Sequence, residues 1–423
     1  MRPITTRMGR STKAWATLLA VAGSACTGGA EYTQTTFAPV TEYGESLNDL
    51  FFNTFWWTMP ILAVVLVLLV YIMIRFREKP GQPTPRQIHG NTMLEVVWTF
   101  VPAVIVMFIA VPAVIAVFDD YERASDEALE VEVIGHQWWW EFRYPAEQVV
   151  TANHLVLPIG REIHLRIWSA DVVHSFWMPR FGGKRDALPL PRTREGERSR
   201  ANHVTFTLNE PGQWRGQCAE YCGEAHAIMA TYAEGMPESE FATWVTSMRD
   251  PGVAAAPAPA DTAGAGAATD TSAAAANPTS PADTAGAGVA TDTSAAAAST
   301  AVASAPVQQP PDTMAAGPEQ VPLEEQGRQL FLSRACIACH AIAGTTARGV
   351  VGPNLTRFGT RPSVGAGALS NTQENVERWI QNPQNVKAGT LMPGAVEAGG
   401  GFPPTNLTAE DVRAIAAYLL SLK

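Results

Sequence analysis

Two long apolar stretches near the N-terminus constrain the fold of this 423-residue chain more than any other feature. Residues 56–76 carry no charge before Arg75, and the one ionisable side chain within residues 93–118 is Glu95. Each stretch is long enough to cross a hydrocarbon core of about 30 Å at about 1.5 Å per residue. We therefore expect a two-helix transmembrane hairpin within residues 40–118.

The charges around these stretches predict the orientation of the hairpin. The loop between them holds one acid, Glu78, and four basic side chains: Arg75, Arg77, Lys79 and Arg86. Positive loops stay on the cytoplasmic side, so both ends of the hairpin should face outward. Residues 1–25 combine basic residues, a short apolar run and small residues, as secretory signal peptides do, and an uncleaved tail is the alternative. Cys26 then stands where a lipoprotein cysteine would stand, so lipidation is left open.

Residues 119–250 are expected to form an all-β domain on the outer side of a bacterial cell membrane. Apolar and polar residues alternate over 129–134, 164–168 and 203–208, which is typical of half-buried strands. Many short strands in a domain of this length favour a sandwich or a Greek-key barrel. With 21 acidic and 13 basic side chains, the domain disfavours nucleic acid and favours a positively charged protein partner.

The chain then changes composition twice. Residues 251–320 are rich in Ala, Pro, Thr, Gly, Ser and Asp, with almost no large apolar groups. Such a segment cannot offset the entropy cost of ordering, so we expect a disordered linker. Residues 321–423 regain large apolar side chains. Thr408 and Asp411 resemble a helix N-terminal capping signal, and the apolar residues of 408–422 then repeat at helical spacing, which indicates a helix there.

A cluster of soft metal ligands lies within residues 218–229. It offers two thiols, an imidazole and a thioether, from Cys218, Cys222, His226 and Met229. Soft sulfur and imidazole select copper, zinc or iron–sulfur, and two cysteines are too few for a closed zinc site without distant ligands. Two copper ions bridged by both sulfurs would use all four groups and need one more histidine. A Cys218–Cys222 disulfide is the alternative.

The last domain carries a second cofactor motif. Cys336, Cys339 and His340 form the C-x-x-C-H pattern by which c-type haem is attached. Zinc is the rival interpretation, but the domain has no second cysteine pair and no other histidine. Met392 is the only methionine after His340, which makes it the candidate sixth ligand of the iron.

The two motifs are similar to those of known families. The pattern C-x-E-x-C-x3-H-x2-M at 218–229 resembles the binuclear copper (CuA) loop of subunit II of haem–copper cytochrome c oxidases. This resemblance implies a cupredoxin-like barrel with copper ligands His174, Cys218, the Glu220 carbonyl, Cys222, His226 and Met229. The last domain resembles a class I cytochrome c. This resemblance implies an all-α domain with further helices over 328–335 and 375–381, in which the Pro353 carbonyl would orient His340.

The resemblance also implies roles for three further positions. Trp138, the first tryptophan of an aromatic run, would receive electrons, although strand aromatics often belong to a core. Glu95 would stand at the mouth of a proton-uptake path, or would be an interfacial carboxylate without a transport role. Asp186 and the Glu220 side chain would face a magnesium ion shared with subunit I.

Together these features predict the electron-input subunit of a proton-pumping cytochrome c oxidase. Electrons would pass from its c haem to the copper pair and on to subunit I, where oxygen becomes water. The expected partners are subunit I, other oxidase subunits, membrane lipid and an external donor such as a cytochrome or a cytochrome c reductase complex. The alternatives are a copper-containing nitric oxide reductase subunit and a free-standing membrane electron carrier.

Overall fold

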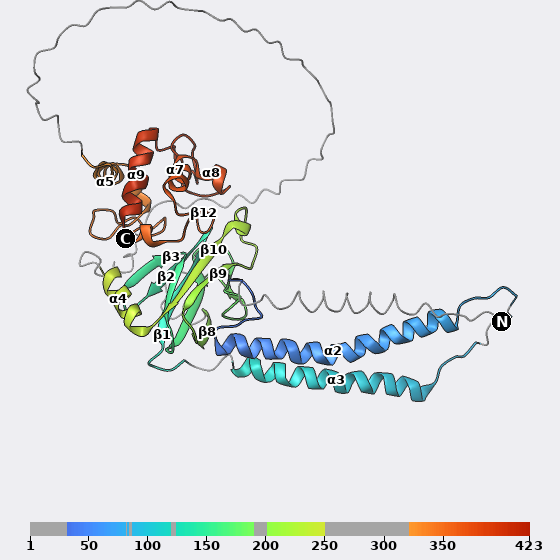
Figure 1. Cartoon of the computed structure of the whole chain (residues 1–423). Coiled ribbons are helices and arrows are strands. Elements are labelled where there is room, and N and C mark those ends of the chain that lie inside the picture. The colour runs from blue at the N-terminus through green and yellow to red at the C-terminus, as the bar shows by residue number, and fades with distance from the viewer. Residues whose placement is uncertain (1–31, 82, 84–86, 120–123, 190–200, 250–320) are drawn as a thin grey trace, which may run out of the picture. The chain divides into compact units, whose positions relative to one another are not determined.

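The computed structural model describes residues 32–81, 83, 87–119, 124–189, 201–249 and 321–423 (Figure 1). The expected signal peptide, Cys26 and the expected linker all lie outside these residues. The described parts of residues 1–255 and 321–423 belong to one compact unit.

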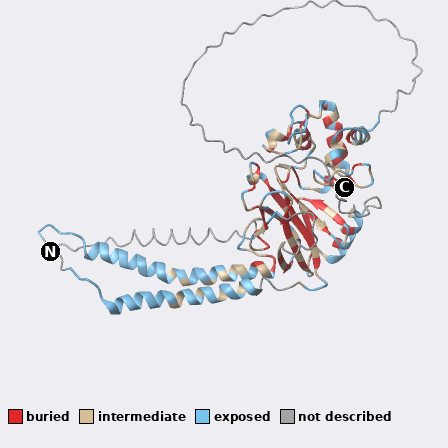
Figure 2. Ribbon diagram, turned by 180° about the vertical axis from the view of Figure 1, so that it is seen from behind, coloured by how far each residue is buried: buried red, intermediate tan, exposed pale blue. Residues whose placement is uncertain are grey.

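Two long helices form the expected hairpin. Helices α2 (Glu42–Arg75) and α3 (Thr92–Asp119) lie side by side, and the Trp57 and Phe108 rings stack at 5.1 Å between them (Figure 1). By length and composition both could cross a membrane. Figure 2 shows that most of their surface is exposed, which for apolar side chains calls for a lipid or protein cover.

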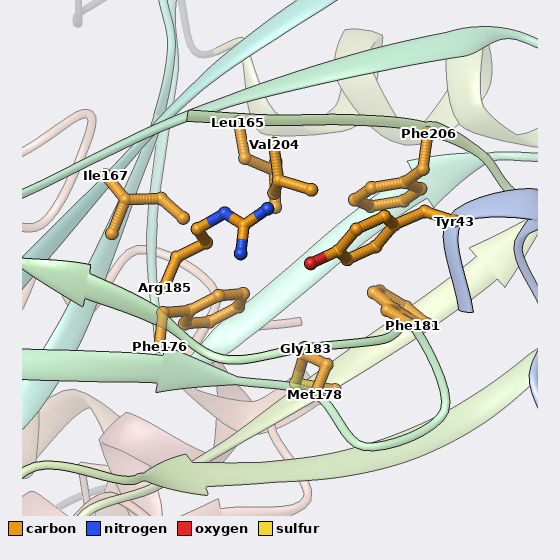
Figure 3. Close-up of a pocket in the computed structure, with 10 residues that line it drawn as sticks. All are labelled: Tyr43, Leu165, Ile167, Phe176, Met178, Phe181, Gly183, Arg185, Val204 and Phe206. Carbon is orange, nitrogen blue, oxygen red and sulfur yellow. The ribbon is translucent and has the colours of Figure 1, made fainter. Parts of the chain in front are cut away.

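Helix α2 begins well before the apolar stretch because its first turn is fixed to the β domain. The Thr41 hydroxyl accepts a hydrogen bond from the Gly44 amide and donates one to the Phe181 carbonyl. The Tyr43 ring enters an apolar crevice between strands, where the Arg185 guanidinium lies 5.3 Å from the ring centre (Figure 3). The hairpin is thereby tied to the same strands that hold the candidate copper ligands.

Residues 129–236 form two five-stranded sheets. The first has the order β3 (Val149–Ala152), β2 (Trp139–Tyr144), β1 (Leu129–His136), β5 (Glu162–Ser169), β8 (Asn202–Thr207). The second has the order β4 (His154–Pro158), β10 (Ala230–Met236), β9 (Gly212–Cys218), β6 (His174–Trp177), β7 (Arg185–Ala187). Strands β1, β5 and β8 contain the three segments whose alternation predicted strands.

Both sheets are mixed, and one apolar core lies between them. Neighbours β1 and β5 run parallel, as do β10 and β4, while the other pairs are antiparallel. The core contains inward side chains of both sheets, including Trp140 and Phe142 on β2 and Phe176 on β6. Helix α4 (Glu238–Met248) packs Phe241 and Val245 against its end. The end of the sandwich at β6 and β9 carries the metal-ligand loop.

Residues 321–423 fold around a separate helical core. The helices are α5 (Leu323–Ser333), α6 (Cys336–Cys339), α7 (Gln373–Gln381), α8 (Pro383–Val386) and α9 (Ala409–Ser421). The described strands here, β11 (Ser363–Val364) and β12 (Leu369–Ser370), have two residues each. Thr408 and Asp411 form the predicted capping box of α9. A Cβ atom at Gly327 would lie 1.9 Å from the Ala414 carbonyl oxygen, so α5 and α9 cross in backbone contact.

Candidate metal and haem sites

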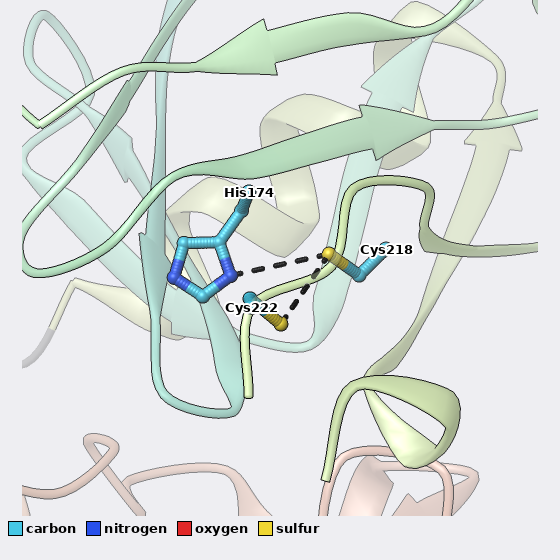
Figure 4. A group of neighbouring side chains, drawn as sticks. All are labelled: His174, Cys218 and Cys222. Carbon is cyan, nitrogen blue, oxygen red and sulfur yellow. Dashed lines mark hydrogen bonds between the residues drawn. The ribbon is translucent and has the colours of Figure 1, made fainter. Parts of the chain in front are cut away.

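The two cysteine sulfurs form the centre of the candidate metal site. Cys218 ends strand β9, Cys222 lies in the following loop, and their Sγ atoms are 3.7 Å apart (Figure 4). Both are free and buried, and 3.7 Å is far beyond the roughly 2.05 Å of a disulfide bond. The disulfide alternative therefore does not describe this structure.

Each sulfur has its own histidine. His174 Nδ1 lies 3.9 Å from Cys218 Sγ, and His226 Nδ1 lies 3.6 Å from Cys222 Sγ. The Met229 sulfur is 3.9 Å from Cys222 Sγ, and the Glu220 carbonyl oxygen is 3.2 Å from Cys218 Sγ. All six predicted ligands thus meet in one place, with one imidazole and one weaker donor within 4 Å of each sulfur.

The electrostatics of the thiol pair suit a cation. The two thiols share one proton: the hydrogen bond from Cys222, with the imidazole of His174, lowers the pKa of Cys218 despite burial, while the same contact raises the pKa of Cys222. Among the described residues, the one group of three or more possible metal ligands within 4.8 Å of one another contains His174, Cys218 and Cys222. The donor set therefore fits two soft metal ions that share both sulfurs.

Asp171 holds the His174 ring in place, a role that the ligand pattern in the sequence does not predict. One carboxylate oxygen lies 2.8 Å from His174 Nε2, and the other accepts a hydrogen bond of 2.6 Å from the Gln137 amide. Burial lowers the pKa of His174, but Asp171 and Cys218 outweigh it and raise the pKa. The His174 ring is fully buried, and its Nε2 atom is occupied by Asp171. The ring is therefore fixed with Nδ1 facing the sulfur pair.

Trp138 lies directly beside the metal-ligand loop. Its indole N–H donates a hydrogen bond of 2.9 Å to the Cys222 carbonyl, and the Gln137 side-chain amide donates a second. The next two tryptophans differ in environment: Trp139 stacks on His136 at 4.2 Å, and Trp140 is fully buried in the core. Among the described hydrogen bonds of these three tryptophans, the one from Trp138 reaches a proposed metal ligand, Cys222.

The two carboxylates expected at a magnesium ion lie on either side of Lys184. Its Nζ atom is 3.1 Å from Glu220 Oε2 and 3.9 Å from Asp186 Oδ1. Strand β7 positions Asp186, and the metal-ligand loop positions Glu220. One ammonium group therefore offsets one of these two negative charges.

Glu95 lies on the first turn of α3 and is exposed. Its carboxylate accepts a hydrogen bond of 3.3 Å from the Asn91 amide, just before the helix. This contact caps the helix. It is compatible with either role predicted for Glu95.

The haem motif surrounds helix α6. Cys336 and Cys339 are free thiols at its two ends, and the His340 ring lies 2.9 Å from the Pro353 carbonyl oxygen. A Cβ at Gly352 would lie 2.6 Å from the His340 ring, so the imidazole packs directly against the backbone at this glycine. Met392 packs against the same core as Cys336. These residues fit a haem attached at Cys336 and Cys339, with His340 and Met392 as axial ligands.

Comparison with known proteins places all three regions. Residues 32–115 match the family described as cytochrome C oxidase subunit II, transmembrane domain. Residues 146–236 match the family described as cytochrome C oxidase subunit II, periplasmic domain. The cytochrome c family matches residues 324–423. These matches confirm the expected order of hairpin, cupredoxin-like domain and cytochrome c domain.

Several individual proteins are similar to the chain. Cytochrome c oxidase subunit 2 of Alkalihalophilus pseudofirmus is 31% identical over 86% of this chain and 84% of its own length. The corresponding protein of Bacillus sp. (strain PS3) is 27% identical over 82% of this chain and 80% of its own length. The crystallised periplasmic domain of cytochrome oxidase subunit II of Bradyrhizobium japonicum is 29% identical, covering 30% of this chain and 96% of that domain, with a TM-score of 0.27.

Proposed function

The chain belongs to the cytochrome c oxidase subunit 2 family, and on this premise we propose that it relays electrons from its own c haem to a binuclear copper centre. The observation that carries the proposal is the arrangement of two free sulfurs 3.7 Å apart, each with its own histidine nitrogen within 4 Å. A bridged copper pair there would accept and pass on one electron at a time. The residues of this chain would hold the copper ions, exclude water from them and provide the path by which electrons arrive.

The fold itself positions the proposed copper ligands. Strand β6 presents His174, strand β9 ends at Cys218, and the short helix η3 (His226–Ile228) presents His226. Asp171 keeps the His174 ring oriented, and burial of Met229 and both cysteines keeps water away. A rigid site of this kind moves little between its two redox states, which favours fast electron transfer.

Trp138 is proposed as the residue through which electrons reach the copper ligands. Its indole hydrogen bond to the Cys222 carbonyl gives a short covalent and hydrogen-bonded route to a bridging sulfur. In the cytochrome domain, Cys336 and Cys339 would attach haem covalently, while His340 and Met392 would ligate its iron. Such His/Met ligation suits electron transfer rather than oxygen binding.

The wider assembly follows from the same premise. Subunit I would take electrons from the copper pair, reduce oxygen to water and share a magnesium ion with Glu220 and Asp186. Binding of that ion requires Lys184 to turn away from Glu220. Glu95 would admit protons to subunit I from the cytoplasmic side. The basic loop between the helices would stay in the cytoplasm, so the copper and haem domains would lie in the periplasm.

The direct test is the electron paramagnetic resonance spectrum of the oxidised, copper-loaded full chain. Hyperfine structure from one electron shared by two copper nuclei is expected, and Cys222→Ser should abolish it. A spectrum from a single copper ion would contradict the binuclear site. Co-purification with a haem–copper subunit that consumes oxygen would separate this proposal from both a nitric oxide reductase and a free-standing carrier.

A further inference from the structure

A buried lysine of the cytochrome domain reaches the copper domain. Lys387, which ends helix α8, is only 2% exposed. Its Nζ atom lies 2.6 Å from the Trp138 carbonyl oxygen, 3.0 Å from that of Ile228 and 3.0 Å from that of Gly365. An ammonium group has three donors, so these three carbonyls satisfy all of them.

Such an environment is specific to one arrangement of the two domains. Taking an ammonium group out of water is expensive unless every proton is hydrogen-bonded, and burial lowers the pKa of Lys387 to about 7. Of the three acceptors, Gly365 alone belongs to the cytochrome domain. Without the copper domain, Lys387 would lose two partners that water would have to replace.

Backbone contacts surround the lysine on both sides. The Ala230 amide donates a hydrogen bond of 2.9 Å to the Ala366 carbonyl, from one domain to the other. A Cβ at Gly367 would lie 2.5 Å from Ala230 Cβ, and one at Gly389 would lie 3.0 Å from the Trp138 ring. The two glycines therefore let the backbone of the cytochrome domain approach closer than any side chain would allow.

This contact connects the two redox sites along the chain. Gly389 lies three residues before Met392, the proposed iron ligand, and touches Trp138, the proposed electron acceptor. Ala230 follows the copper ligand Met229. Trp138 is only 9% exposed in this arrangement, and Gly389 of the cytochrome domain lies against its ring.

We propose that residues 365–367 and 387–389 form a docking surface for the Trp138 face of this chain's own copper domain, with Lys387 as its anchor. The proposal rests on the proposed function and adds to it the residues that hold the two domains together for electron transfer. Since the anchor is buried, docking should depend little on salt, unlike attraction between exposed charges.

Hydrogen exchange of the Ala230 amide in the full, haem- and copper-loaded chain tests the docking. This amide is bonded across the contact, so its protection reports how often the domains separate. Lys387→Met leaves buried carbonyls unpaired and should lower that protection at least about tenfold, in line with the loss of hydrogen bonds to a charged group. Arg413→Met removes an exposed positive charge of the same domain, on helix α9, and should leave it unchanged.

A second variant separates the anchor from general charge attraction. Lys387→Arg keeps the charge, but its planar group does not fit three carbonyls that surround a compact ammonium. It should lose protection as Lys387→Met does, with unchanged exchange of the cytochrome core amides and an unchanged haem spectrum. Wild-type protection in either Lys387 variant, or equal loss in Arg413→Met, would overturn the docking proposal. Failure of photoreduced haem to reduce copper in the wild type would instead refute the proposed function.

Discussion

Substitution of one glycine should disable the candidate copper site while leaving every ligand in place. A Cβ at Gly135 would lie 2.7 Å from Cδ2 and 3.0 Å from Cγ of the His174 ring. Ordinary carbon contacts are about 3.5–4.0 Å, so Gly135→Ala must move the ring by roughly 1 Å. The ring has little room to move, because it is fully buried, packed against Trp140 at 5.8 Å and bonded to Asp171.

The size of the effect follows from the tolerance of metal sites. Metal–ligand distances vary by only about 0.2 Å, and disturbed ligand orientation typically lowers metal affinity about 10–100-fold. Overpacking should also destabilise the fold by about 1–3 kcal/mol. We therefore expect Gly135→Ala to fold, to bind copper at least about tenfold more weakly in competition with a chelator, and to show an altered copper hyperfine pattern.

A matched variant separates the copper effect from the folding effect. A Cβ at Gly235 would lie 2.4 Å from the Leu208 side chain and 3.0 Å from the Trp214 ring, so Gly235→Ala creates a similar clash in the same domain. It displaces no ligand and should lower the unfolding temperature without changing copper affinity or spectrum. Wild-type copper binding by Gly135→Ala, or an equal loss in Gly235→Ala, would refute the reasoning.

Three further predictions concern single side chains. Asp171→Asn removes a negative charge bonded to His174, so the oxidised copper centre should lose stability and its midpoint potential should rise in a redox titration; an unchanged potential would contradict this role. Met392→Ala should lower the haem potential and open the iron to carbon monoxide, while retained wild-type values would exclude Met392 as a ligand. Burial raises the pKa of Glu141, but a hydrogen bond from His136 and a nearby arginine outweigh it and lower the pKa to about 2. This lowering from 4.5 contributes about 3 kcal/mol to the free energy of unfolding above pH 4.5, and the contribution is lost as the pH falls toward 2. The unfolding temperature of Glu141→Gln should therefore fall less steeply between pH 4.5 and pH 2 than that of the wild type, and an equally steep fall would contradict this role.

Sequence patterns located some of the elements and named the residues of the candidate sites. Alternation located strands β1, β5 and β8, and helical spacing located α9, because each element buries one face, while the resemblance to class I cytochromes c located α7. The proposed copper ligands could be named because five of the six lie within residues 218–229. The start of α2 was missed, since Thr41 and the β domain fix it rather than apolar periodicity.

The supporting contacts could not be predicted, because they join residues far apart in the chain. Asp171 precedes His174 by only three residues, so its contact with that ring had a local signal, but its bond to Gln137 depends on the packing of β1 beside β5. Lys387 has no motif at all. Its partners are backbone carbonyls of Trp138, Ile228 and Gly365, and carbonyls look alike in every sequence.

The central claim is that electrons pass within this chain from haem to copper. The most direct test is to photoreduce the haem in the purified, fully loaded chain and to follow haem and copper absorbance together. We expect copper to become reduced at the rate at which the haem becomes oxidised, and Trp138→Ala to slow both to the same extent. A haem that stays reduced beside oxidised copper, or that loses its electron without copper reduction, would contradict the account.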